Sequence, residues 1–299
     1  MTTYRFSTCD VFTRTRFGGN QLAVIHDGRG LSDQAMQSIA REFNYSETTF
    51  VLPPADPRHT ARVRIFTPAR ELPFAGHPTV GTAFVLASEG AFSAQTHDIT
   101  FEEEVGPVPV RIERAGDSVV RCTLTTARLP EGGADAAPAP ARERLARMLA
   151  LAPDEVLAGA ECWSCGLPYL VVPLASTAAL TRCALDLAVW REVLGGYATR
   201  KVYPVARVDE HCWRVRMFAP GAGVAEDPAT GSAAAAFAGW LACRSQLVDG
   251  TTKVALLQGQ EIGRPSTLEL ELDRRQQRTT AVRVGGSSVM VSTGTLFVD

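Results

Sequence analysis

Two segments of the chain share one pattern of hydrophobic and polar positions. Residues 216–233 read R-M-F-A-P-G-A-G-V-A-E-D-P-A-T-G-S-A, and residues 64–83 read R-I-F-T-P-A-R-E-L-P-F-A-G-H-P-T-V-G-T-A. Each begins with the alternation of a strand, in which Arg216 and Phe218 are expected to point outward and Met217 inward. A loop rich in Gly and Pro follows, and it leads into an apolar stretch.

The two apolar stretches predict helices that are buried on all sides. No charged residue lies between Ser232 and Cys243, and a helix that is hydrophobic all round belongs in a core. The corresponding helix of the first segment is expected over residues 80–89. The N-terminus of such a helix presents backbone N–H groups, which bind anions well.

The repeat extends to the flanking elements, and its period is about half the chain, so it indicates a duplicated domain and not a solenoid. Strands followed by amphipathic helices precede both segments, and Ser32 is a plausible N-cap for a helix over residues 33–43 that ends at Asn44. We therefore expect an α+β fold of two pseudo-symmetric domains, each a mostly antiparallel sheet curled around its own apolar helix. A site is expected in the cleft between them.

The boundaries of these domains follow from one change in composition. Residues 128–140 are rich in Pro, Gly and Ala, as an exposed linker would be. The predicted domains are residues 1–127 and 141–286. Residues 287–299 form final strands that could return to the N-terminal domain.

Bulk composition excludes several classes of function. Of 299 residues, 45% are hydrophobic and 21% charged, and the net charge is −2, so the chain lacks the basic surface of a protein that binds nucleic acid or an anionic membrane. No apolar run is long enough to span a membrane, and the N-terminus lacks the apolar core of a signal peptide. Seven scattered cysteines favour a reduced, cytoplasmic protein.

Three polar residues stand out as candidates for chemistry. Glu47 lies at a strand entry between hydroxyl residues, where partial burial would raise the pKa of its carboxyl and suit proton transfer, although a solvated turn residue is the simpler reading. The matching segment of the second half has no acid. His77 and Asp227 occupy matching positions, each before a Pro. They could position a substrate and relay a proton, or serve as ordinary turn residues.

Other residues and motifs give weaker evidence of a functional site. Cys162 and Cys165 have redox spacing but no helix to lower a thiolate pKa, so buried structural cysteines are the expected reading. No His/Cys cluster has metal-ligand spacing, and no glycine-rich loop has the context of a nucleotide site, so neither a metal nor a cofactor is expected. Arg64 and Arg216 could bind a carboxylate, but salt bridges are expected for residues in alternating strands.

With these residues in view, the chain resembles the PhzF-like family of phenazine biosynthesis isomerases. The matching segments are G-N-Q-L-A-V (residues 19–24), M-Q-S-I-A-R-E-F-N-Y-S-E-T-T-F-V-L-P (36–53), residues 64–83 quoted above, E-D-P-A-T-G-S-A (226–233) and Q-G-Q-E-I-G-R-P-S (258–266). Together they cover most of the chain.

The resemblance implies a diaminopimelate epimerase-like fold and assigns roles to residues. Glu47 would be the catalytic acid/base, assisted by His77 and Asp227. The residues implied to bind the substrate and its carboxylate are Asn20, Gly76, Thr230, Gly231 and Ser232.

The reaction implied by the family is the isomerisation of trans-2,3-dihydro-3-hydroxyanthranilate, in which a proton leaves C3 and one is delivered at C1. The resulting enol becomes a ketone, and no cofactor or metal takes part. The family also implies a homodimer. One departure is Gln21, where the family commonly has Pro, and it alters the predicted turn near the cleft.

Two alternatives to this isomerase remain. One is an amino-acid epimerase or racemase that works without thiols, since neither loop contains a cysteine. The other is a protein that binds a small carboxylate on the same scaffold without turnover.

Overall fold

The computed structural model describes residues 1–133, 138–245 and 247–299. The chain divides into two compact units: unit 1 comprises Met1–Ala127 and Val284–Asp299, and unit 2 comprises Arg128–Arg283. Four residues of the predicted linker, 134–137, lie outside the described residues. Each unit has its own hydrophobic core.

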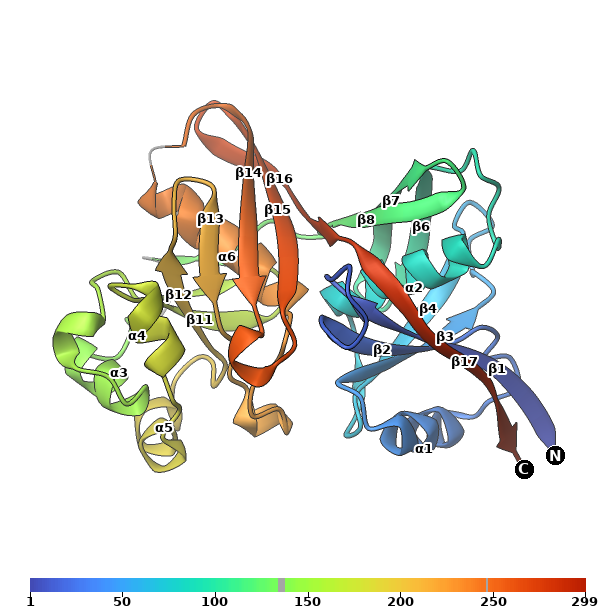
Figure 1. The fold of residues 1–299 in the computed structure, drawn as a ribbon, viewed down its shortest axis with the longest axis horizontal. Helices are drawn as coiled ribbons and strands as arrows, with labels where there is room; N and C mark the ends of the chain where they lie inside the picture. Colours follow the sequence, from blue (N-terminus) through green and yellow to red (C-terminus); the bar gives the residue numbers. More distant parts are fainter. Residues whose placement is uncertain (134–137, 246) are drawn as a thin grey trace. The chain divides into compact units, whose positions relative to one another are not determined.

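Unit 1 begins and ends with neighbouring strands. Its elements are β1 (Thr2–Val11), β2 (Asn20–Ile25), α1 (Asp33–Phe43), β3 (Glu47–Leu52), β4 (Ala61–Phe66), β5 (Glu71–Leu72), α2 (Gly76–Ser88), β6 (Asp98–Glu103), β7 (Gly106–Ala115), β8 (Ser118–Thr125) and β17 (Ser288–Val298). β17 pairs with β1 along its whole length, so the two chain ends lie side by side (Figure 1).

Unit 2 carries the remaining elements. They are β9 (Glu131–Gly132), α3 (Arg142–Met148), η2 (Pro153–Glu155), β10 (Glu161–Ser164), β11 (Pro168–Pro173), α4 (Thr177–Arg182), α5 (Leu187–Leu194), β12 (Val202–Arg207), β13 (Cys212–Val215), η3 (Pro220–Ala222), α6 (Gly231–Arg244), β14 (Gly250–Gln258), η4 (Gln260–Ile262), β15 (Ser266–Arg275) and β16 (Arg278–Gly286). The boundary with unit 1 falls within β16.

The strands of the two units pair in the same sequence of directions. From β1 through β2, β3, β4 and β6 to β7, the neighbours are antiparallel, parallel, antiparallel, parallel and antiparallel. The same five steps join β10, β11, β12, β13, β14 and β15. The predicted α+β class with mostly antiparallel sheets is therefore confirmed, and the repeat read from the sequence is a repeat of topology.

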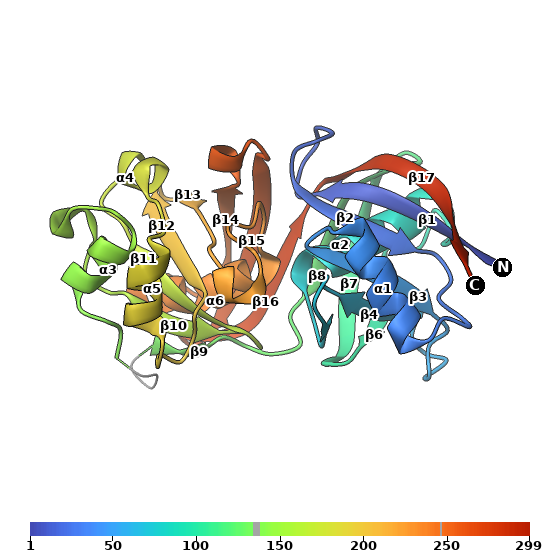
Figure 2. The same ribbon diagram turned by 90° about the horizontal axis from the view of Figure 1, so that it is seen from below.

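A buried helix lies inside each sheet, as Figures 1 and 2 show for α2 and α6. Residues 76–87 of α2 and 231–241 of α6 are all buried. Close packing requires small residues: a Cβ on Gly81 would come within 2.6 Å of side-chain carbons of both Leu22 and Val11. The all-round apolar pattern thus marks the central helix of each unit.

Local signals place the amphipathic helix α1. The Ser32 side chain accepts a hydrogen bond from the Ala35 N–H, and Asn44 closes the helix in the left-handed conformation (φ 52°), as predicted.

Two expectations about local structure are wrong. α2 begins at Gly76 and not at residue 80, because Pro78 is compatible with a first helical turn, where no N–H is needed. Strand β13 ends at Val215, and Arg216, Met217 and Phe218 are all buried instead of alternating outward and inward.

Candidate functional site

The matched positions of His77 and Asp227 differ in structure. His77 is the second residue of α2, whereas Asp227 lies in the loop before α6, which begins at Gly231. Gly76, which directly precedes His77 and is also a predicted site residue, is the first residue of α2. The side chain of His77 therefore projects from a fixed helical turn, and that of Asp227 depends on its loop contacts.

In unit 1 the structure brings together three of the predicted residues. Nε2 of His77 lies 3.4 Å from Oε2 of Glu47, and Nδ2 of Asn20 lies 3.2 Å from Nδ1 of His77. Ser46 donates its hydroxyl to Oδ1 of Asn20 (3.2 Å), which turns the amide nitrogen of Asn20 toward the imidazole. The carboxyl of Glu47 thus has an oriented imidazole beside it.

Strand order accounts for this grouping. β2 and β3 are parallel neighbours, with Leu22 opposite Glu47, so Asn20 and Glu47 both lie where their strands begin. The side chain of Glu47 is 16% exposed, whereas that of His77 is 5% exposed. Of the two side chains, that of Glu47 is the more exposed.

Burial decides the charge of His77. Desolvation lowers the pKa of its imidazole to about 3, while a hydrogen bond with the Gln21 backbone acts in the opposite direction. At neutral pH the ring is uncharged, so the 3.4 Å contact between its Nε2 and Oε2 of Glu47 is not an ion pair.

In unit 2 a closed set of hydrogen bonds holds Asp227. Thr230 donates its hydroxyl to Oδ2 of Asp227 (2.5 Å). Nε2 of Gln258 donates to the hydroxyl oxygen of Thr230 (3.0 Å) and to the backbone carbonyl of Asp227 (2.8 Å). The backbone N–H of Thr230 donates to Oε1 of Gln258 (3.3 Å). Three buried residues therefore fix the loop that precedes α6.

A second contact reaches the first turn of α6. Oγ of Ser232 lies 2.6 Å from Oη of Tyr169, and both residues are buried. Nζ of Lys201 lies 5.0 Å from the centre of the Tyr169 ring. Gly231 precedes Ser232 as the first residue of the helix, so predicted residues 230–232 are consecutive positions around one helix N-terminus.

Sequence reasoning missed Gln258 and Tyr169. Gln258 opens the segment Q-G-Q-E-I-G-R-P-S, and a Gln at the end of a mostly apolar strand was the signal available. Tyr169 opens an apolar strand and carries no local mark of its contact with Ser232.

The two arginines of the repeat form ion pairs, as predicted. Arg216 binds Glu226 through two hydrogen bonds of 2.8 and 2.7 Å, and Arg64 binds Glu71 through two of 2.7 and 2.6 Å. Each guanidinium also stacks on a Phe two residues later, at 4.9 and 5.1 Å from the ring centre. These contacts explain why Arg216 can be buried.

The other features considered in the sequence are the cysteine pair, metal sites and membrane-spanning helices. Cys162 and Cys165 are buried, and burial raises the pKa of the Cys162 thiol. Within residues 1–133, 138–245 and 247–299, no group of three or more His, Cys, Asp or Glu side chains could hold a metal ion. No helix in these ranges is long and apolar enough to cross a membrane.

Comparison with known proteins gives matches across the chain. A family model described as phenazine biosynthesis-like protein matches residues 9–294. An uncharacterized isomerase of Mesorhizobium japonicum is 43% identical, with 100% of both chains covered. A trans-2,3-dihydro-3-hydroxyanthranilate isomerase of Pseudomonas aeruginosa is 36% identical over 99% of this chain and 100% of its own.

The fold has a solved counterpart as well. A phenazine biosynthesis protein of the PhzF family from Bacillus anthracis superposes with a TM-score of 0.88 and 24% identity, covering 100% of both chains. This similarity supports the predicted fold.

Proposed function

Because this chain belongs to the phenazine biosynthesis-like protein family and is an isomerase, we propose that it moves a proton on a small cyclic carboxylate by acid/base catalysis. The substrate to test first is trans-2,3-dihydro-3-hydroxyanthranilate, after which the Pseudomonas aeruginosa relative is named. The observation that carries the proposal is the pairing of the partly exposed Glu47 with the buried, neutral His77.

Glu47 is the proton carrier in this proposal. Its carboxylate removes the C3 proton of the substrate, the electron pair of that C–H bond shifts into the conjugated system, and the protonated Glu47 delivers a proton to C1. The enol then becomes a ketone without any change in oxidation state. A positioned carboxyl that acts as both base and acid typically contributes 10²–10⁴-fold, by order of magnitude.

His77 and Asn20 position Glu47. Nδ2 of Asn20 lies 3.2 Å from Nδ1 of His77, and Nε2 of the same ring faces the Glu47 carboxyl at 3.4 Å. Because this imidazole is neutral, it does not form a full ion pair with the Glu47 carboxylate.

Residues 227–232 supply the binding groups. Asp227, fixed by Thr230 and Gln258, accepts a hydrogen bond from the amine or hydroxyl of the substrate. The first N–H groups of α6 and the hydroxyl of Ser232 hold the substrate carboxylate, as helix N-termini hold anions. Gly76, at the start of α2, presents a backbone N–H in the same manner.

The test compares turnover and binding in Glu47→Gln and Glu42→Gln. Glu42 is an exposed carboxylate on α1 and serves as the matched control. We expect Glu47→Gln to lose roughly 10²–10⁴-fold in kcat, with KM changed much less, and Glu42→Gln to match the wild type. Normal turnover by Glu47→Gln would refute the role of Glu47. Binding without turnover by the wild type would favour a non-catalytic protein.

A further inference from the structure

Glu103 is a buried carboxyl group to which the proposed reaction gives no role. It is the last residue of β6 and is 7% exposed. Its Oε1 lies 2.5 Å from Oγ1 of Thr79, which is on the first turn of α2, two residues after His77. Its Oε2 is buried and lacks a hydrogen-bond partner among the described residues.

The hydrogen bonds of Thr79 indicate the protonation state of Glu103. Oγ1 of Thr79 lies 2.8 Å from the carbonyl oxygen of Ala75 and 2.5 Å from Oε1 of Glu103, so one hydroxyl faces two acceptors. The hydroxyl has a single proton to donate. If that proton goes to Ala75, only a protonated Glu103 can complete the second bond.

Desolvation favours the same form. An ionised Glu103 would leave Oε2 charged, buried and without a hydrogen bond, which is costly. Burial raises the pKa of Glu103 to about 8, while the Thr79 hydrogen bond acts in the opposite direction. The neutral acid therefore predominates at neutral pH.

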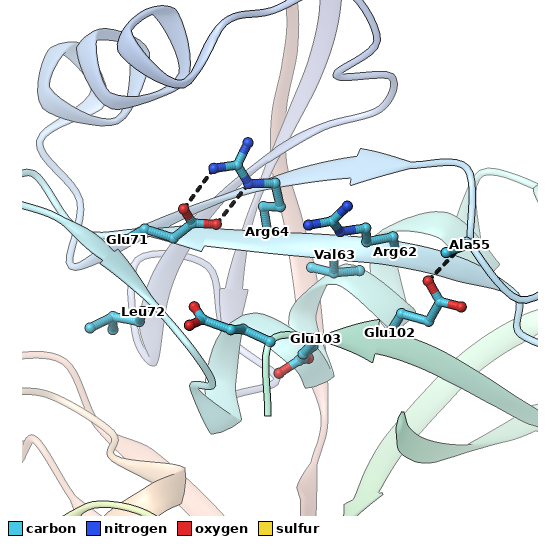
Figure 3. Close-up of a pocket in the computed structure, with 9 residues that line it drawn as sticks. Ala55, Arg62, Val63, Arg64, Glu71, Leu72, Glu102 and Glu103 are labelled. Carbon is cyan, nitrogen blue, oxygen red and sulfur yellow. Dashed lines mark hydrogen bonds and ion pairs between the residues drawn. The ribbon is translucent and has the colours of Figure 1, made fainter. Parts of the chain in front are cut away.

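The charged groups around Glu103 are largely engaged elsewhere. Glu103 lines a pocket of about 420 Å³ (Figure 3). Its other charged lining residues are Arg62, Arg64, Glu71, Glu102 and Glu104. Figure 3 shows Glu71 paired with Arg64 and Glu102 bonded at Ala55.

The remaining charged or titratable groups near Glu103 are either paired, exposed to solvent or neutral. Glu102 also accepts hydrogen bonds from Asp56 and His59, and Arg62 and Glu104 are exposed. From α2, the titratable group nearest in sequence to Thr79 is the neutral His77. On β7, Gly106 faces Glu103, and no titratable residue occurs among residues 106–108.

We infer that Glu103 is a positioning residue: as a neutral acid it holds the first turn of α2 and, through that turn, keeps His77 opposite Glu47. Loss of its proton leaves the single hydroxyl proton of Thr79 to serve both Ala75 and Glu103, so one of the two bonds is lost, the turn loosens and activity falls on the alkaline side. The activity part of this inference rests on the proposed function, whereas the protonation of Glu103 does not.

The test compares the wild type with Glu103→Gln and with Glu104→Gln as control, since Glu104 is an exposed acid on the same pocket. Gln can donate to Thr79 and cannot ionise. We expect Glu103→Gln to keep kcat/KM within about 3-fold of the wild type at neutral pH and to lack the alkaline decline. The wild type and Glu104→Gln should both decline above pH about 8, chiefly in kcat.

Stability supplies a readout that needs no substrate. Folded Glu103 keeps a proton that the unfolded chain releases, so the wild type should lose stability relative to Glu103→Gln as pH rises from 4.5 to about 8. Urea unfolding midpoints measure this, and Glu104→Gln should follow the wild type. A constant difference across this window would overturn the inference, even if neither protein converts the test substrate.

Two other results would also contradict it. One is a folded Glu103→Gln that is inactive at every pH, because the carboxylate would then be the required form. The other comes from the wild type alone: a ¹³C carboxyl shift of Glu103 typical of an ionised group at neutral pH. The NMR measurement decides the matter if Glu103→Gln does not fold.

Discussion

His77 has a carboxylate 3.4 Å from its Nε2, an arrangement that often produces an imidazolium. Here burial outweighs that attraction, because the side chain is 5% exposed and desolvation lowers the pKa of the imidazole to about 3. The local sequence G-H-P contains no sign of this. The burial of His77 follows from its place within α2, and that helix was expected to begin four residues later.

We predict that the imidazole of His77 stays neutral from pH about 5 to about 8. ¹⁵N NMR of the imidazole measures its charge state. A titration near the ordinary value of 6.5 would contradict the burial argument.

The lowered pKa of His77 also predicts how stability changes with pH. The unfolded chain binds a proton near pH 6.5 that the folded chain accepts only near pH 3, so the wild type loses stability as pH falls through this window. The loss is at most about 1.4 kcal/mol per pH unit. His77→Asn should lack this loss when urea unfolding is compared in the two proteins.

Gln258 is the residue on which the Asp227 loop depends. We predict that Gln258→Leu destabilises unit 2 by about 1–3 kcal/mol, because the Asp227 carbonyl and the Thr230 N–H lose buried partners. We also expect kcat to fall at least about 10-fold as Asp227 loses its fixed position. Gln260→Leu, at an exposed position two residues later, is the control. Equal effects of the two substitutions would show that Gln258 has no special role.

At the scale of elements, the sequence was most informative where local chemistry decides the outcome. Ser32 and Asn44 bracket α1 because capping is a property of a few neighbouring residues. The start of α2 was wrong because Gly76, His77 and Pro78 are also typical of a loop, and only packing inside the sheet decides between them. Contacts between distant elements, such as Tyr169 with Ser232, have no local signal.

Close packing around the buried helix α2 predicts that enlarging its glycine lowers stability. Gly81→Ala should destabilise unit 1 by about 1–3 kcal/mol through overpacking against Leu22 and Val11, although Ala favours a helix over Gly by about 1 kcal/mol. Gly196→Ala, where an added Cβ meets nothing within 4 Å, should change stability by less than about 0.5 kcal/mol. Thermal unfolding compares the two. A stabilised Gly81→Ala would mean that α2 packs less tightly than described.

At the scale of the whole molecule, the repeated topology allows equivalent strand positions of the two units to be compared, and they differ in whether they carry an acid. Glu47 stands opposite Leu22 in the β2–β3 pair, and Val202 stands opposite Leu170 in the corresponding β11–β12 pair. The duplicated framework therefore carries the acid in unit 1 alone at this strand position. Sequence comparison of the halves had already indicated that the second lacks an acid here.

Unit 1 depends on the end of the chain. β17 pairs with β1 from Val298 opposite Thr2 to Ser288 opposite Val11. We predict that removing residues 288–299 costs roughly 5 kcal/mol or more, since a full strand of hydrogen bonds is lost. Hydrogen exchange should then show unit 1 unprotected. Phe297→Thr, at a residue 69% exposed, should leave protection unchanged. A truncated chain with protected β1 and β2 would contradict this account.

In the proposed reaction, Glu47 moves the proton. The measurement that tests it most directly is a proton NMR time course in D₂O with trans-2,3-dihydro-3-hydroxyanthranilate, comparing the wild type with Glu47→Gln. We expect that only the wild type consumes the substrate and that solvent deuterium appears at the accepting carbon. Conversion at an equal rate by folded Glu47→Gln would contradict it. If neither folded protein converts the compound, this substrate is wrong and other small cyclic amino acids follow.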